Sequence, residues 1–139
     1  PYQLVENGFD VWIGNNRGNF HSNKHTSLDR KKNKNDFWNF TYHQMGMKDV
    51  PAMTDYILGL TKKEKLTYIG HSRGCAQFFV LCSLNPNYCK EKFNGFVALA
   101  PAVFIGKTKS GLSKTGLTML AGMMNFFKMG NKGITWYCI

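Results

Sequence analysis

The pattern of apolar and polar positions divides the first third of the chain into short elements. Residues 4–8 predict the end of a helix that stops at Gly8, and residues 9–13 predict the strand that follows it. Residues 21–35 are polar, basic and without period, which predicts an extended excursion over the surface. The aromatic-rich residues 36–42 predict a segment that packs this excursion back onto the core.

The following part of the chain alternates between helix and strand. Asp49 predicts a helix N-cap, and Pro51 in the first helical turn supports that start. Helix, charged turn, strand, helix and strand then follow over residues 49–60, 62–65, 66–69, 77–84 and 93–101. The second helix is expected to stop at Asn85 and Pro86. This order predicts an α/β fold with a mostly parallel sheet and helices on both faces, the last strand being buried.

One short motif, Gly70-His71-Ser72-Arg73-Gly74, directly follows a predicted strand and precedes an apolar helix. This context predicts a nucleophile elbow, in which Gly70 and Gly74 leave room for the strand and the helix to approach closely. The turn would hold the hydroxyl of Ser72 above the sheet, with His71 beside it. The backbone N–H of Arg73 would be one of two donors to an oxyanion. The alternative is an ordinary buried turn.

Basic residues are unevenly distributed in this chain of net charge +10. Ten basic and seven acidic residues occur up to Ser72, whereas eight basic residues and only Glu91 follow it. The basic run at residues 30–34, near Phe37 and Trp38, raises the alternative of nucleic-acid binding. No helix-turn-helix, zinc or RNA-recognition signature accompanies the run, so we expect a solvated loop and no specific nucleic acid. No apolar run in the sequence is long enough to span a bilayer.

Four cysteines, Cys75, Cys82, Cys89 and Cys138, show no C-x-x-C spacing. We therefore expect neither a metal site nor another cofactor. Cys75 and Cys82 lie two helical turns apart on one face of the predicted helix, which suits small core residues better than metal ligands.

A glycine-rich loop at residues 14–19 follows the first predicted strand. Open α/β sheets place ligand-facing residues at the C-terminal ends of their strands. We therefore expect Asn15, Arg17 and Gly18 to support the site, with Arg17 orienting neighbouring loops. On composition alone, a surface cation in a glycine-rich turn is an equally good interpretation of Arg17.

Residues Asn39, Phe40 and Thr41 form an N-glycosylation sequon. Such triplets are frequent by chance, and this one can be used only if the chain enters the secretory pathway. Asn39 is therefore a candidate glycosylation site.

Five blocks, residues 10–19, 37–40, 49–52, 68–74 and 98–101, occur together in one order and spacing. In this combination the chain resembles the acid lipases, the gastric and lysosomal acid lipase family of α/β hydrolases, over about residues 1 to 105. The resemblance implies an esterase that acts on triacylglycerols or sterol esters at a lipid–water interface. It also implies a lysosomal or secreted protein.

The resemblance further implies that Ser72 is the nucleophile and that the N–H of Arg73 belongs to the oxyanion hole. Residues 1–104 would be the central part of a hydrolase core, and residues 105–139 would begin a cap. The chain departs from the family at two positions. Arg73 stands where the family usually has Gln, and Gln44 stands where it usually has Glu.

The catalytic acid and base are absent from their expected positions. In this fold the triad runs serine, acid, histidine along the chain. No histidine follows Ser72, and the only later carboxylate is Glu91. The four histidines that precede Ser72, none of them expected to be the base, are His21, His25, His43 and His71.

Two interpretations therefore stay open. The chain begins without Met and ends on apolar residues, so we expect a central piece of a serine lipase. Its acid, base and second oxyanion donor would then lie outside these 139 residues. The alternative is a truncated or degenerate hydrolase fold, catalytically inactive, that serves as a binding or structural component.

Overall fold

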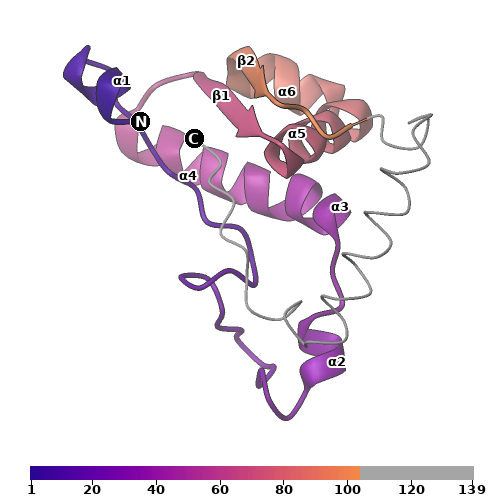
Figure 1. The fold of residues 1–139 in the computed structure, drawn as a ribbon. Helices are drawn as coiled ribbons and strands as arrows, with labels where there is room; N and C mark the ends of the chain where they lie inside the picture. Colours follow the sequence, from indigo (N-terminus) through magenta and orange to yellow (C-terminus); the bar gives the residue numbers. More distant parts are fainter. Residues whose placement is uncertain (104–139) are drawn as a thin grey trace, which may run out of the picture.

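The computed structural model describes residues 1–103. In that part, two parallel strands, β1 (Leu66–His71) and β2 (Phe93–Leu99), lie among short helices (Figure 1). The helices are, in order, α1 (Tyr2–Glu6), α2 (Lys34–Phe37), α3 (Tyr42–Gln44), the π-helical η1 (Met45–Asp49), α4 (Val50–Thr61), α5 (Arg73–Leu84) and α6 (Pro86–Lys92). The predicted α/β class with a parallel sheet is confirmed. The expected cap at residues 105–139 lies outside the described residues.

Aromatic rings from both strands and from α5 form the core. The ring of Phe78 stacks on those of Tyr68 and Phe96, with centroids 4.8 and 4.2 Å apart. Phe93 packs edge-on against the same ring at 4.9 Å, and Val50 of α4 joins the cluster. Such ring pairs contribute about 0.5–1.5 kcal/mol each beyond the area that they bury. The cluster fixes α5 against the sheet, and therefore the start of α5 against the end of β1.

The strand β2 is more exposed than its apolar sequence predicts. Val97 and Leu99 are each 44% exposed. Within the described residues β2 pairs only with β1, so one of its edges has no neighbouring strand. The prediction of a buried strand over residues 93–101 is therefore wrong for the end of β2, because a strand is buried only where neighbours cover both of its faces.

The strand predicted over residues 9–13 does not form, although α1 ends as predicted with Gly8 at φ +84°. This segment passes along α4, where the ring of Trp12 packs edge-on against that of Tyr56 at 6.4 Å. An alternating pattern favours an extended backbone, but a strand also needs a hydrogen-bonded neighbour. Residues 9–12 and β1 line a common cavity and do not pair with each other.

The helix α4 begins directly after Asp49, with Pro51 in its first turn as predicted, but a helical run already begins before it, at a capping box. The Oγ1 of Thr41 accepts from the backbone N–H of His43 at 3.2 Å, and the Oε1 of Gln44 accepts from the N–H of Thr41 at 2.8 Å. The helical run continues through η1 into α4, so Asp49 has the N-cap position of α4 but itself has helical φ and ψ of −77° and −44°, and its side chain makes no capping hydrogen bond. Since only an oxygen of residue 44 is used here, the usual family Glu would serve equally well.

A disulfide between Cys82 and Cys89 joins α5 to α6. Between them Asn85 ends α5 as predicted, and its Oδ1 then accepts from the N–H of Tyr88 at 3.3 Å as the cap of α6. The predicted core position is confirmed for Cys75, which is 0% exposed and has a free thiol. Cys82 is partly buried and also packs against the core, but as half of a disulfide that the sequence did not predict, because the turn into α6 brings Cys89 back against α5.

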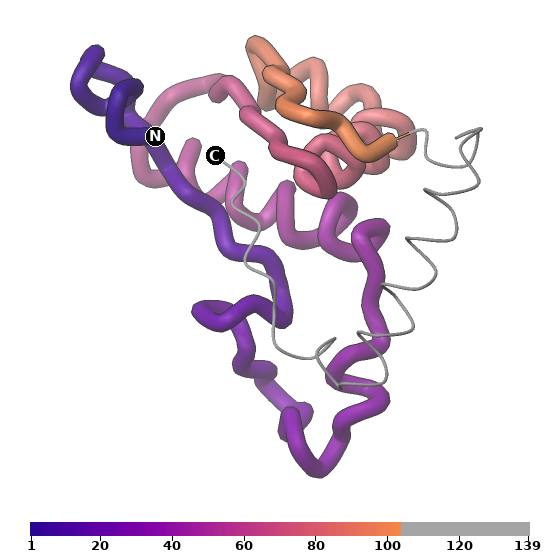
Figure 2. Tube along the Cα trace, viewed as in Figure 1, coloured from indigo at the N-terminus to yellow at the C-terminus, as the bar shows by residue number. Residues whose placement is uncertain are grey.

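Residues 20–40 leave the body of the molecule and return through α2, as Figure 2 shows. Phe37 is buried and packs against Trp38, with ring centroids 5.1 Å apart. The basic residues 30–34 are exposed. The predicted surface excursion is therefore confirmed, but its aromatic return segment packs within itself and beside Gly18, and none of its residues belongs to the cluster around Phe78.

Candidate active site

Ser72 is the single residue between β1 and α5, and its backbone has φ 53° and ψ −110°. A non-glycine residue in such a region is strained by about 1–3 kcal/mol and stays there only when its surroundings hold it. The N–H of Ser72 donates to the carbonyl of Leu99 at 2.9 Å. Its own carbonyl accepts from the N–H groups of Cys75 and Ala102 at 3.2 and 3.4 Å. The motif thus forms a sharp, firmly held strand-to-helix turn with a partly exposed serine.

The two glycines of the motif lie where strand and helix touch. A Cβ on Gly70 would stand 2.8 Å from the backbone nitrogen of Cys75 and 2.9 Å from the carbonyl carbon of Gly74. The hydroxyl of Tyr68 donates to the carbonyl of Gly74 at 3.2 Å, and the thiol of Cys75 donates to that of Gly70 at 3.0 Å. Backbone approaches this close leave no room for a side chain at position 70.

The residues on either side of Ser72 differ in their placement. Arg73 is the first residue of α5, so its backbone N–H is one of the amides that point out of the helix N-terminus. These amides carry the positive end of the helix dipole, which favours negative charge near them. His71 ends β1 and is exposed. The positive end of the α5 dipole therefore lies directly after Ser72 in the chain.

Two of the histidines that precede Ser72 make their contacts within the surface excursion, not at the elbow. The Nδ1 of His25 accepts two backbone N–H groups of its own loop, at 3.1 and 3.0 Å. The ring of His21 packs edge-on against Phe20 at 5.2 Å. Glu91 lies exposed on α6. These contacts do not bring His21, His25 or Glu91 to the turn at Ser72.

Arg17 holds the loop at residues 14–19 against the η1–α4 helical run. Its Nε and Nη2 lie 2.8 and 2.6 Å from Oδ1 of Asp49, and its backbone N–H donates to Oδ2 at 2.9 Å. Asp49 is only 9% exposed. The guanidinium also lies 5.9 Å from the ring centroid of Phe40. Arg17 is therefore a paired cation; the sequence contains no sign of this pairing beyond the presence of both residues in the matched blocks.

Asn15 and Gly18 stabilise the same loop. The Oδ1 of Asn15 accepts from Nδ2 of Asn19 at 2.7 Å. Gly18 has φ +79°, and a Cβ there would lie 2.6 Å from the ring of Phe40 and 2.8 Å from that of Trp38. The contacts of these two residues therefore hold the shape of the loop.

We expect Arg17→Lys to lower the free energy of unfolding by about 1–2 kcal/mol, because lysine keeps the charge but cannot reproduce the planar fork on Asp49. Urea unfolding of the purified protein measures the change. Arg30→Lys is the matched control, since Arg30 lies in the exposed basic run, and we expect it to change stability by less than about 0.5 kcal/mol. Equal effects of the two substitutions would contradict a stabilising role for the Arg17–Asp49 pair.

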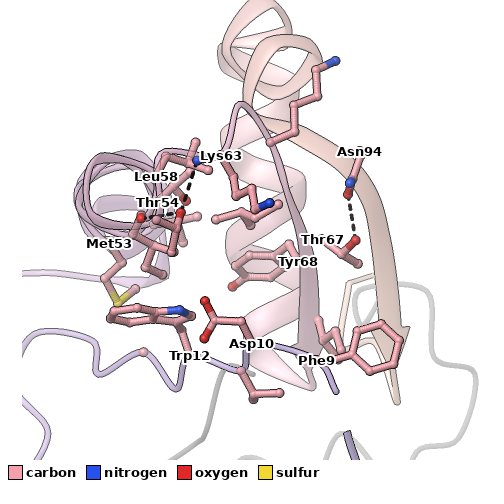
Figure 3. Close-up of a pocket in the computed structure, with 18 of the residues that line it drawn as sticks. Phe9, Asp10, Trp12, Met53, Thr54, Leu58, Lys63, Thr67, Tyr68 and Asn94 are labelled. Atoms are coloured by element: carbon pink, nitrogen blue, oxygen red, sulfur yellow. Dashed lines mark hydrogen bonds between the residues drawn. The ribbon is translucent and has the colours of Figure 1, made fainter. Parts of the chain in front are cut away.

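An apolar cavity of about 510 Å³ lies between residues 9–14, α4 and β1. In Figure 3, Trp12 and Met53 lie at one side of it and Tyr68 at another. Ser72 is not among its lining residues. The cavity therefore lies apart from the turn that holds Ser72.

Neither a metal centre nor a membrane span is evident in the described part of the chain. There, no three His, Cys, Asp or Glu side chains gather as metal ligands would. None of the helices in residues 1–103 has the length and apolar character needed to cross a bilayer.

The model of the alpha/beta hydrolase fold family matches residues 1–132. The chain belongs to this family. Its relatives include Lipase 1 of Drosophila melanogaster, 48% identical over 108 residues, and the lysosomal acid lipase/cholesteryl ester hydrolase of Macaca fascicularis, 40% identical over 113 residues. Lipase member K of Homo sapiens is 37% identical over 131 residues. The resemblance to acid lipases is thereby confirmed.

These alignments cover most of this chain but little of the relatives. The alignment with Lipase 1 covers 78% of this chain and 24% of the relative. The alignment with the Macaca fascicularis lipase covers 81% of this chain and 28% of the relative, and that with Lipase member K covers 94% and 32%. The chain therefore spans about a quarter to a third of the length of the curated relatives that it matches.

Proposed function

We propose that this chain is the central part of a serine-dependent lipase that hydrolyses neutral lipid esters, either triacylglycerols or sterol esters. The observation that carries the proposal is the backbone of Ser72, at φ 53° in a one-residue turn between β1 and α5. Strained residues of this kind cluster at catalytic positions, where the fold over-determines them. The proposal of a lipid ester substrate is supported by the names of the relatives, one of which is a cholesteryl ester hydrolase.

In the proposed reaction, the hydroxyl oxygen of Ser72 attacks the carbonyl carbon of the ester and gives its proton to a base. The N–H of Arg73 stabilises the oxyanion that forms. The intermediate then expels the alcohol, which takes the proton from the same base, and leaves an acyl group on Ser72. Water, activated by the base, releases the fatty acid. The base, its orienting acid and the second oxyanion donor come from parts of the protein outside these 139 residues.

The proposal that the chain is part of a lipase also suggests its domain boundaries and its cellular location. Residues 1–104 are the central part of the hydrolase core, and residues 105–139 begin the cap. The substrate is reached at a lipid–water interface. The Cys82–Cys89 disulfide supports a secreted or lysosomal location, because disulfides persist in oxidising compartments and are rare in the cytosol.

Fatty acid release from emulsified triolein and cholesteryl oleate by the full-length protein tests the proposed function. We expect hydrolysis of at least one of them, and its loss in Ser72→Ala. Binding of the emulsion without hydrolysis, by folded protein, would instead support the alternative of a catalytically inactive hydrolase fold. Hydrolysis that persists in Ser72→Ala would contradict the serine mechanism.

A further inference from the structure

One sequence motif has no part in the proposed reaction: the sequon Asn39-Phe40-Thr41. It is the only Asn-X-Ser/Thr triplet in the 139 residues whose middle residue is not proline. We propose that Asn39 carries an N-linked glycan in the mature protein. Four features of the structure support this assignment: the exposure of Asn39, the lack of competing side-chain contacts at this residue within the described part of the chain, its distance from the elbow, and the disulfide.

The first feature is the local conformation. Asn39 follows α2 in a turn, where its N–H donates to the carbonyl of Asp36 at 3.2 Å and the N–H of Phe40 donates to that of Trp38 at 2.9 Å. The rings of Trp38 and Phe40 point toward Gly18, as the close approaches to that glycine require. Asn39, between them, is exposed. N-glycans need such exposed turn positions, because they are bulky and hydrophilic.

The second feature is the lack of competing contacts. No side-chain hydrogen bond of Asn39 is present among residues 1–103, so attaching a sugar to its amide nitrogen breaks none there. The hydroxyl of Thr41 takes part in the capping box of α3. That box forms only when the helix does, whereas N-glycans are added to the chain before it folds, so the two uses of Thr41 do not conflict.

The third feature is the position of the turn in the fold. In Figure 1, α2 lies at the far tip of the molecule from β1 and α5, which meet at Ser72. A glycan two residues after α2 therefore projects away from the elbow. We expect its removal to leave the specific activity of the full-length protein unchanged.

The fourth feature is the disulfide, which indicates the kind of compartment in which N-glycosylation takes place. The Cys82–Cys89 bridge indicates that the chain matures in an oxidising compartment, and the lumen of the endoplasmic reticulum is both oxidising and the place where N-glycans are added. A sequon that occurs by chance in a cytosolic protein would not be expected together with a disulfide. This inference rests on the compartment and not on catalysis, so it can fail while the proposed lipase function holds.

Peptide mass spectrometry of the full-length protein, expressed through the secretory pathway of insect cells, tests the site. Trypsin releases residues 35–48 as one peptide, since lysines stand at positions 34 and 48 with none between. We expect this peptide to carry an N-glycan. Digestion with peptide-N-glycosidase F in heavy-oxygen water should convert residue 39 to a labelled aspartate.

Three variants make the result specific. Asn39→Gln should remove the glycan, whereas Thr41→Ser should keep it because serine completes the sequon. Asn35→Gln is the matched control, since Asn35 is an exposed asparagine four residues upstream that belongs to no sequon, and it should keep the glycan. The peptide is analysed both from total membranes, which retain misfolded variants, and from the medium. The measured glycan occupancy then does not depend on whether a variant folds. Recovery of the 35–48 peptide only in its unmodified form would overturn the proposal.

Discussion

A fluorophosphonate probe should label the full-length protein at Ser72, and Ser72→Ala should abolish that labelling. The same substitution should lower kcat for ester hydrolysis by roughly 10⁴-fold or more, because no other group in the turn can form the acyl intermediate. Serine hydroxyls are weak nucleophiles unless a base and oxyanion donors activate them. The strained backbone of Ser72, held by its hydrogen bond to the carbonyl of Leu99, is the structural reason to expect activation here.

Two further variants separate the nucleophile from its surroundings. Ser83→Ala is the matched control, since Ser83 is an exposed serine within α5 and should leave labelling and kcat unchanged. Arg73→Gln introduces the usual family residue and keeps the backbone N–H, so we expect it to change kcat by less than about tenfold, far less than the loss of an oxyanion donor. Labelling that survives in Ser72→Ala would refute the assignment.

The 139-residue chain by itself should not turn over esters. Catalysis by serine requires a positioned base and an acid that orients it, and their absence leaves only a small residual acceleration. No histidine follows Ser72, and Glu91 lies exposed on α6. With one backbone donor at Arg73, the turn alone provides little stabilisation of the transition state.

Hydrolysis of p-nitrophenyl butyrate by the purified, monodisperse chain measures this expectation. The chain should show no more turnover than its own Ser72→Ala variant. Turnover well above background that disappears in Ser72→Ala would mean that one of the four histidines serves as the base. Substituting each histidine in turn would then identify it.

The sequence alone determined the elements whose conformation is fixed by adjacent residues. The turn at Ser72 depends on the five consecutive residues 70–74. Gly70 lets β1 and α5 approach closely, and α5 begins only three residues later. The end of α5 at Asn85 and the order of β1, α5 and β2 follow from equally short patterns. The α/β class was therefore predictable before any contact between distant residues was known.

Only the tertiary structure decided which distant groups meet. Arg17 and Asp49 are 32 residues apart, and only the folded chain brings them together, so Asp49 pairs with a cation in place of capping a helix. The segment 9–13 has the pattern of a strand, yet it does not form one, and a cavity lies between it and β1. Cys89 reaches Cys82 because α6 folds back on α5. Local patterns restrict φ and ψ, but pairing depends on how elements pack, which no short window of sequence contains.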